Sequence, residues 1–529
     1  MLRTSEIVDS TDRITVEDIP PELITEVLLA LRDSSKHTTS TAWLVATWVC
    51  RRWREIALSS PHLWAKIHMG PWDWSPEMLS TFIERSSHVD LDVHVDIGIP
   101  LRRDTRELLV AHAYRTQALH ITFFWKGESV QVQNLVDALG PRLTSLSLAH
   151  GTKYGVDVIL RPSLSSLRSL CMQLCKARVE FCLNNLTHLE LRRQWPPNKC
   201  GKEMMSYFCS LLDSCPNIET LALIDMHYSL IGAEPTTHLS LLHKLRELKI
   251  RDHCRALQRL TYLLPVTPGT SVILEGYRCR WREWVGRALF GELFLSEDPR
   301  IGCTPAQHIS NPTAERMVLT VGAEDNVARL AAFAKSVDTV PQLALSVIHD
   351  SGYFAWFPAI LRRDVGAIVQ CIKPFELELH AAPYITKLAS ARQSILSNCW
   401  SVQKLLLGGA FAATDEFSLL ADFIFDRHID PPMPELRELT LCVGSLGELD
   451  MDAIRESLSA RLAVNSKLEK LVICLPENCE DAASRHSQET FESITLQIRT
   501  GCCKLCSQKG ERWEHEVCAV FLTVPLPGS

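Results

Sequence analysis

The stretch Val49-Cys50-Arg51-Arg52-Trp53-Arg54-Glu55-Ile56-Ala57 determines how the beginning of this chain folds. Val45, Val49, Trp53 and Ile56 recur at intervals of three or four residues, so they line one face of a helix. Cys50 and Ala57 widen that face, and the arginines lie away from its centre. The spacing predicts an amphipathic helix that extends from Val45 to Ala57.

Two further short helices flank this one. The first opens at Pro20 and Pro21, because proline is tolerated in a first turn where no N–H partner exists. The third begins with Ser60 as cap and Pro61 at the first helical position. The first helix carries two apolar stripes, which are Leu23, Val27 and Leu31, and beside them Ile24 and Leu28. Three helices this short seldom cover each other's apolar surface, so the surplus face rests on the remaining chain or on a partner.

These residues resemble a known family. Ile19-Pro20-Pro21-Glu22-Leu23-Ile24-Thr25-Glu26-Val27-Leu28 looks like the opening of an F-box. Val49 to Ala57, followed by Ser59-Ser60-Pro61-His62-Leu63-Trp64, looks like its close in the form common in fungal F-box proteins. The chain departs from the pattern in the polar insert from Asp33 to Thr41, which separates the first two helices.

The resemblance implies a domain organisation and a partner. Residues 1–13 are expected to be disordered, residues 14–68 to form a three-helix F-box, and residues 69–525 to form the remaining domain. F-boxes bind the Skp-type adaptor of a cullin-based ubiquitin ligase. The residues assigned to adaptor binding are Ile19, Pro20, Leu23, Ile24, Val27, Val45, Val49, Cys50 and Trp53. Trp64 is expected instead to seat the F-box on the first repeat.

Composition excludes several classes of protein. The 529 residues carry a net charge of only −7, which gives no reason to expect nucleic acid or a membrane as the main partner. No run reaches the roughly 18 apolar residues of a membrane span, and the first ten residues lack the features of a signal peptide. The 19 cysteines are scattered from Cys50 to Cys518, which favours free thiols in a reducing compartment. We therefore expect a cytoplasmic or nuclear protein.

A recurring strand signature fills the rest of the chain. The spacing apolar-x-x-Leu-x-apolar is typical of a leucine-rich-repeat strand, whose inner leucines point into a shared core. Its copies are Leu143–Leu148, Leu186–Leu191, Ile218–Leu223, Leu245–Ile250, Val402–Leu407, Leu436–Leu441, Leu468–Ile473 and, more weakly, Leu167–Met172. The predicted fold class is thus α/β, with a small N-terminal three-helix F-box followed by a degenerate leucine-rich-repeat-like solenoid. Unrelated βα units in a doubly wound sheet are the alternative.

Other segments fit this scheme with less regularity. Met78 to Ile83 has helical spacing, and Val89 to Val95 alternates as a half-buried strand does. Helices are also expected from the spacing at Met204–Leu212, Phe417–Ile424 and Ile454–Leu462. Residues 251–375 form an irregular middle, with strands expected at Ser271–Glu275, Met317–Val321, Leu343–Ile348 and Phe375–Leu379.

No catalytic motif is present, so we expect neither an enzyme nor a cofactor, and no catalytic or metal residue is assigned. Cys502, Cys503, Cys506, His515 and Cys518 have spacings that would suit zinc, but their flanking sequence matches no zinc module, and a last strand that caps the array is the alternative. Arg278, Arg280 and Arg282 alternate with aromatic residues and suit capture of an acidic peptide or substrate. A helix with solvated arginines is the alternative there.

The combination resembles F-box proteins with leucine-rich repeats. That family implies a substrate-recognition adaptor of a Skp-cullin-F-box ubiquitin ligase, in which the F-box docks the Skp-type adaptor and the repeats bind a protein substrate of unknown identity. The alternative is a protein-interaction scaffold outside any ligase, whose F-box-like segment is only an N-terminal cap.

Overall fold

The structure is a computed structural model, and the chain divides into two compact units, Met1–Pro196 and Pro197–Ser529. The residues it describes are 18–34, 41–70, 75–97, 101–124, 129–151, 156–179, 181–193, 208–226, 242–253, 264, 270–277, 316–322, 327–333, 343–348, 374–381, 401–409, 435–442, 467–475, 488–491 and 494–500. Nothing in this division tests the predicted boundary at residue 68.

The first unit begins with a helical segment. It comprises α1 (Pro21–Ser34), the 3-10 helix η2 (Ala42–Trp48), α2 (Arg51–Ser59) and the single turn α3 (Pro61–Trp64). The predicted continuous helix from Val45 to Ala57 is therefore wrong. Cys50 is extended, with φ −156° and ψ 170°, and it separates η2 from α2. Apolar spacing continues across this break, so periodicity alone did not detect it.

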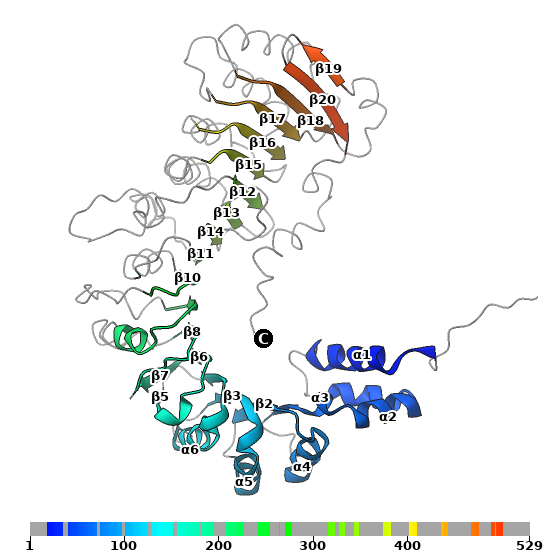
Figure 1. The fold of residues 1–529 in the computed structure, drawn as a ribbon, viewed down its shortest axis with the longest axis vertical. Helices are drawn as coiled ribbons and strands as arrows, with labels where there is room; N and C mark the ends of the chain where they lie inside the picture. The colour runs from blue at the N-terminus through cyan, green and yellow to red at the C-terminus, as the bar shows by residue number, and fades with distance from the viewer. Residues whose placement is uncertain are drawn as a thin grey trace, which may run out of the picture. The chain divides into compact units, whose positions relative to one another are not determined.

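A parallel sheet follows in the same unit (Figure 1). Its strands pair in the order β1 (Lys66–Met69), β2 (Leu91–Ile97), β3 (Thr116–Phe123), β4 (Ser145–His150), β6 (Ser169–Gln173) and β8 (His188–Arg192). Between them lie α4 (Pro76–Arg85), α5 (Arg103–Ala111), η3 (Ala113–Arg115), α6 (Ser129–Leu139), η5 (Gly140–Arg142) and η6 (Pro162–Leu164). A small separate sheet pairs β5 (Val156–Leu160) with β7 (Cys175–Val179) in parallel.

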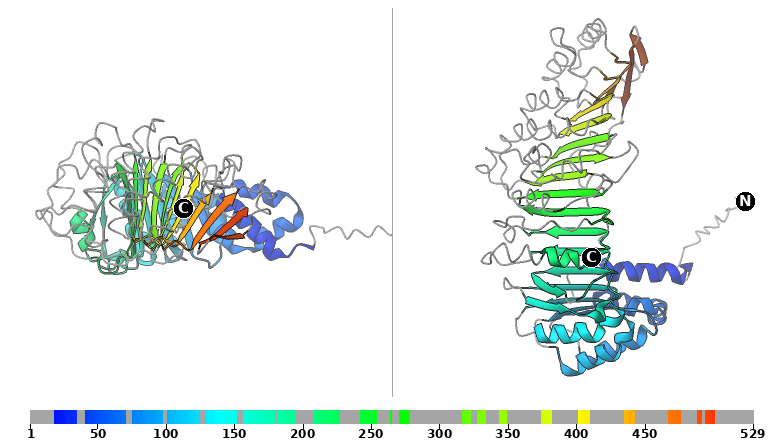
Figure 2. Two further views of the ribbon diagram at one scale, coloured as in Figure 1. Left: turned by 90° about the horizontal axis from the view of Figure 1, so that it is seen from above. Right: turned by 60° about the vertical axis from the view of Figure 1, so that its left-hand side comes forward.

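The second unit is also built around a sheet (Figure 2). Parallel pairs join β9 (Thr220–Ile224), β10 (Glu247–His253), β11 (Ser271–Tyr277) and β14 (Leu343–Ile348). β13 (Val327–Phe333) lies antiparallel between β14 and β12 (Arg316–Gly322). Parallel pairing then resumes through β15 (Glu376–Ala381), β16 (Lys404–Gly409), β17 (Glu438–Cys442), β18 (Lys470–Leu475) and β20 (Ile494–Thr500), and β19 (Gln488–Phe491) pairs antiparallel with β20.

The repeated sequence signature explains how neighbouring strands align. Its first apolar residue is buried just before the strand, as Leu167 and Leu186 are, at 1% and 0% exposure. The next carbonyl then accepts two N–H groups from the following copy: Arg168 O accepts from Thr187 and His188, both at 2.9 Å. Gln403 O accepts in the same way from Arg437 and Glu438.

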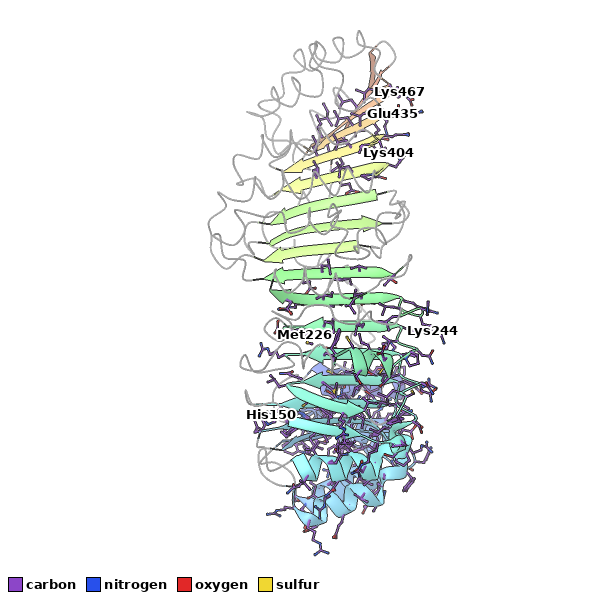
Figure 3. The ribbon with its side chains drawn as sticks, turned by 90° about the vertical axis from the view of Figure 1, so that its left-hand side faces the viewer. His150, Met226, Lys244, Lys404, Glu435 and Lys467 are labelled. Atoms are coloured by element: carbon purple, nitrogen blue, oxygen red, sulfur yellow. The ribbon has the colours of Figure 1, made fainter. Side chains whose placement is uncertain are left out.

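Side chains reinforce this alignment in the second unit. The Lys467 ammonium, just before β18, lies 2.6 Å from the Glu435 carboxylate, just before β17. Figure 3 labels both residues. The Lys470 ammonium lies 2.7 Å from the Glu438 carboxylate at the starts of the same two strands. Because these pairs are partly exposed, each contributes little stability and mainly favours this register.

The predicted fold class, a three-helix F-box followed by a leucine-rich-repeat-like solenoid, is wrong. The described residues form an α/β structure dominated by mainly parallel strands, with few helices. The N-terminal segment contains a 3-10 helix and a single helical turn in place of three regular helices. The antiparallel strand β13 interrupts the parallel order. The physical reason is that the repeated strings encode buried leucines in parallel strands, which any buried parallel sheet needs, and they do not encode the connections.

The individual strands are nevertheless confirmed. All eight copies of the signature coincide with strands, and so do the four strands predicted in the irregular middle. The helix at Met78–Ile83 and the strand at Val89–Val95 correspond to α4 and β2. Residues 208–213 are helical and overlap the predicted Met204–Leu212 helix. The helices predicted at Phe417–Ile424 and Ile454–Leu462 lie outside the described residues.

Candidate functional site

The two apolar stripes of α1 lie in opposite environments. Ile24 and Leu28 are buried at 1% and 0% exposure, in the core of the first unit. Leu23, Val27 and Leu31, one turn apart on the neighbouring stripe, remain 56%, 45% and 43% exposed. α1 therefore buries one stripe and presents the other to solvent.

The next segment adds further exposed apolar side chains. In η2 and the residue after it, Val45, Trp48 and Val49 are 60%, 74% and 63% exposed, whereas Trp43 is buried at 3%. We call Leu23, Val27, Leu31, Val45, Trp48 and Val49 the apolar face. Scattered exposed apolar residues are ordinary on a soluble protein, but a concentration of them within one short segment is typical of an interaction surface.

Two arginines fix the position of α1. The Arg52 guanidinium, in the first turn of α2, donates a 2.6 Å hydrogen bond to the Ile19 carbonyl before α1. At the other end of α1, the Arg32 guanidinium donates a 2.7 Å hydrogen bond to the His62 carbonyl of α3. The first bond holds the start of α1 next to the start of α2, so Leu23 and Val49 belong to neighbouring parts of the segment.

Trp64 joins the helical segment to α4. Its indole Nε1 donates to the Ala57 carbonyl at 2.8 Å. Its ring meets Trp43 and Phe82 edge-on, with ring centroids 5.2 Å and 5.0 Å away, and the Arg85 guanidinium lies 4.4 Å from its centroid. Trp64 is 2% exposed. Trp64 therefore packs the helical segment against α4, but α4 belongs to an α/β unit and not to the first repeat of the expected solenoid.

The residues predicted to bind the adaptor do not all belong to the apolar face. Pro20, Leu23, Val27, Val45 and Val49 are exposed, and Ile19, Cys50 and Trp53 are partly buried. Ile24 is only 1% exposed, so it packs in the core and does not belong to the apolar face. Sequence reasoning missed Trp48, whose position in a 3-10 turn lies off the predicted helical face.

The remaining sequence candidates are one arginine cluster and one cluster of cysteines with a histidine. Arg278, Arg280 and Arg282 lie outside the described residues, as do Cys502, Cys503, Cys506, His515 and Cys518. Among described cysteines, those with free thiols include Cys50, Cys175 and Cys182, whereas Cys474 is disulfide-bonded and departs from the expectation of free thiols.

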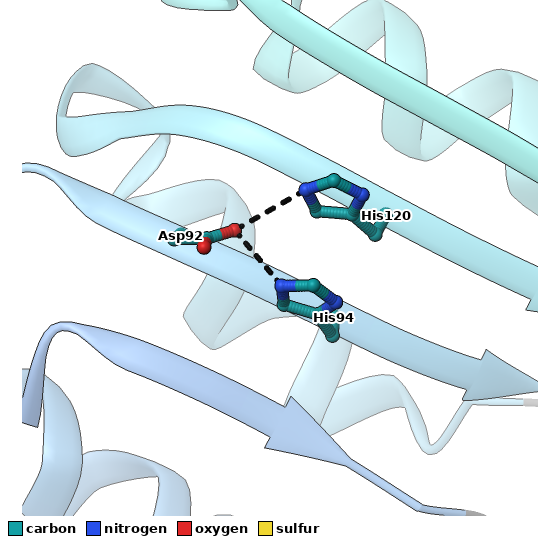
Figure 4. Close-up of side chains that lie close together, drawn as sticks. All are labelled: Asp92, His94 and His120. Carbon is teal, nitrogen blue, oxygen red and sulfur yellow. Dashed lines mark ion pairs between the residues drawn. The ribbon is translucent and has the colours of Figure 1, made fainter. Parts of the chain in front are cut away.

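A polar cluster on β2 and β3 was not anticipated from the sequence (Figure 4). The Asp92 Oδ1 atom lies 3.2 Å from His94 Nε2 and 3.5 Å from His120 Nε2. The two imidazole rings stack with centroids 4.0 Å apart and planes within 8°. His68, on β1, meets His94 edge-on at 5.5 Å and lies 3.9 Å from the Asp96 carboxylate. Strand register brings these residues together, because His68, His94 and His120 are direct neighbours across β1, β2 and β3.

The cluster perturbs the protonation of its members. Burial, with a further contribution from His94, lowers the pKa of His120 to about 4. Burial and His94 also lower the pKa of His68. For Asp92, burial acts to raise the pKa, but the contacts with His94 and His120 and the nearby Lys66 outweigh it and hold the pKa below its ordinary value. At neutral pH the cluster therefore presents a charged carboxylate and a neutral His120.

Comparison with known proteins supplies no relative for this chain. No protein-family model matches it, and no curated protein sequence matches it either. Within the described part of the chain, no helix has both the length and the apolar character needed to cross a membrane. Functional inference therefore depends on the two surfaces described above.

Proposed function

We propose that the N-terminal helical segment docks a Skp-type adaptor of a cullin-based ubiquitin ligase and that the rest of the chain binds a protein substrate. In this proposal the chain is not an enzyme. It is the substrate-recognition adaptor of the ligase, and it acts in the cytoplasm or nucleus.

The observation that carries the proposal is the apolar face. Five of its members, Leu23, Val27, Val45, Trp48 and Val49, are between 45% and 74% exposed. Full burial of a large apolar side chain stabilises by about 1.5–3 kcal/mol, so roughly 1 kcal/mol remains available at each half-exposed position. The same stretch carries the sequence resemblance to an F-box, which supplies the identity of the partner.

The proposed activity requires no catalytic residue in this chain. An adaptor that holds a substrate beside a ubiquitin-charged enzyme raises the effective concentration of substrate lysines. Such a device needs one surface for the ligase and another for the substrate, and the mainly parallel sheets of the two units offer extended surfaces for the second role.

The rival is a protein-interaction scaffold whose N-terminal helices only cap the fold. The Trp64 junction favours this rival, because Trp64 packs against both Trp43 and Phe82 and so ties the helical segment to α4. A cap has no use for a concentrated exposed apolar face, however, and that difference separates the two proposals experimentally.

Co-purification of the full chain with a Skp-type adaptor tests the proposal. The wild-type chain is expected to form a stable complex, and Leu23→Asp to abolish it, because a charge would be buried without a partner. The matched control is Val130→Asp on α6, where the native side chain is 65% exposed and lies outside the apolar face. Failure of the wild-type chain to bind, or equal loss in both variants, would favour the scaffold.

A further inference from the structure

The polar cluster on β2 and β3 has the composition of a metal site. Asp92 offers a carboxylate oxygen and His94 and His120 each offer an imidazole nitrogen, and one ligand atom from each lies within 4.8 Å of the others. All three side chains project from one side of the sheet. Asp92 and His94 are two residues apart on β2 and so share a face, and His94 pairs with His120 on β3. The three side chains are 38%, 24% and 20% exposed, so the cluster lies near the surface of the sheet.

The distances between these atoms match the requirements of tetrahedral coordination. Zinc lies about 2.0–2.1 Å from imidazole nitrogen and carboxylate oxygen, which separates any two tetrahedral ligand atoms by about 3.3 Å. The two separations from Asp92 Oδ1 are 3.2 Å and 3.5 Å. The stacked rings must turn about their terminal torsions to aim both nitrogens at one ion, and those sp³–sp² torsions are soft.

Two polar atoms of the cluster do not have a well-formed hydrogen bond within the described structure. Asp92 Oδ1 and His94 Nε2 are both buried, and although they lie 3.2 Å apart they are not aligned well enough for a regular hydrogen bond. A buried polar atom without a partner costs about 1–3 kcal/mol. A bound cation would satisfy the oxygen and the nitrogen together.

The lysine beside the cluster does not neutralise it. Lys66 stands beside Asp92 in the strand register, but its ammonium lies 3.2 Å from the Asp33 carboxylate. Two imidazoles and one carboxylate suit first-row transition ions, whereas Mg²⁺ and Ca²⁺ prefer sites made of oxygen. We propose that Asp92, His94 and His120 bind one divalent transition-metal ion, of which Zn²⁺ fits best, with the fourth position open to water or to a ligand side chain from a partner.

Calorimetric titration of the chelator-treated full chain with Zn²⁺ tests this proposal. The wild type is expected to bind one more Zn²⁺ than the double variant Asp92→Asn/His120→Gln, or to bind it at least about tenfold more tightly. The matched control is His188→Gln, a partly buried histidine on β8 of the same unit, and it should retain the wild-type titration. Equal stoichiometry and affinity in the wild type and the double variant would overturn the proposal.

Cobalt separates this site from any bound by cysteines elsewhere in the chain. Co²⁺ held by Asp92, His94 and His120 gives visible d–d bands without a thiolate-to-cobalt charge-transfer band, and the double variant should lose those d–d bands. A wild-type spectrum made only of thiolate-bound cobalt would contradict the proposal. If the double variant fails to fold, zinc-edge anomalous diffraction of the wild type decides, with a peak between the three side chains expected and its absence overturning the site.

Discussion

The helices α1 and α4 are both amphipathic and belong to the same unit, yet they differ in what they leave exposed. α4 buries Leu79, Phe82 and Ile83 at 0%, 2% and 2% exposure, and it has no large exposed apolar side chain. α1 buries Ile24 and Leu28 but keeps a second stripe in solvent. An amphipathic helix needs only one apolar stripe to pack on a core. Among the described residues, the second stripe of α1 is not part of the core, and that surplus is the basis of the proposed docking surface.

The largest contrast is expected between the two stripes of α1. Leu28→Ala should reduce the free energy of unfolding of the first unit by about 2–5 kcal/mol, because it opens a cavity at a fully buried position. Leu23→Ala should change it by less than about 1 kcal/mol, since that side chain is already 56% exposed. Urea unfolding followed by tryptophan fluorescence measures both. Equal losses would show that Leu23 is a core residue and would remove the contrast between α1 and α4.

The next contrast lies in how each helix is anchored. Arg115, only 7% exposed, donates to the Val89 carbonyl, the Ile83 carbonyl and the Ser86 hydroxyl, and so holds the end of α4. Arg115→Ala removes these hydrogen bonds at a buried position, although the Ile83 carbonyl keeps the Ser86 hydroxyl as a donor, and should destabilise by about 2–3 kcal/mol. Arg52→Ala removes one hydrogen bond to the Ile19 carbonyl and should cost about 1 kcal/mol. Urea unfolding of the two variants measures both losses of unfolding free energy. A larger loss for Arg52→Ala than for Arg115→Ala would contradict this prediction.

Thiol reactivity should also distinguish the helical segment from the interior. Cys175 is fully buried on β7, and burial raises its pKa to about 12, so little thiolate forms near neutral pH. Cys50 is a partly exposed free thiol beside the apolar face. Brief alkylation of the native chain, followed by peptide mass spectrometry, should label Cys50 and leave Cys175 unmodified until the chain is unfolded. Comparable labelling at both sites would mean that the reagent reaches Cys175 in the native chain, and it would contradict this prediction.

The smallest effect is expected at the ion pair between β1 and α1. Lys66→Met removes the 3.2 Å contact with the Asp33 carboxylate, and both side chains are partly exposed. Such pairs contribute about 0–1 kcal/mol, so the unfolding midpoint should hardly move. A loss above about 2 kcal/mol would indicate that this pair, and not the packing of Ile24 and Leu28, secures α1.

Sequence patterns predicted the strands well because each strand carries its own signal. The spacing from Leu186 to Leu191 marks buried leucines on β8 without reference to any other part of the chain. Sequence patterns failed to predict features that depend on contacts with another segment of the chain. Ile24 and Leu23 are equally apolar, and only packing determines which is buried. The break at Cys50 was hidden because apolar spacing continues through it.

The polar cluster could not be predicted from the sequence for a similar reason, because one of its members comes from another strand. Asp92 and His94 are adjacent positions on one face of β2, and that much can be read from alternation. His120 lies 26 residues beyond His94, and it joins them only through the pairing of β2 with β3. Outside the repeated signature, strand pairing depends on the connections as well as on the apolar pattern, and short strings of sequence do not specify those connections.

Hydrogen exchange of the full chain with and without a Skp-type adaptor tests the docking proposal most directly. Residues 21–53 of the helical segment are expected to gain protection in the complex, while residues 76–85 of α4 in the same unit keep their rates. Binding that leaves residues 21–53 unchanged, or an adaptor that causes no protection anywhere in the chain, would contradict the proposal.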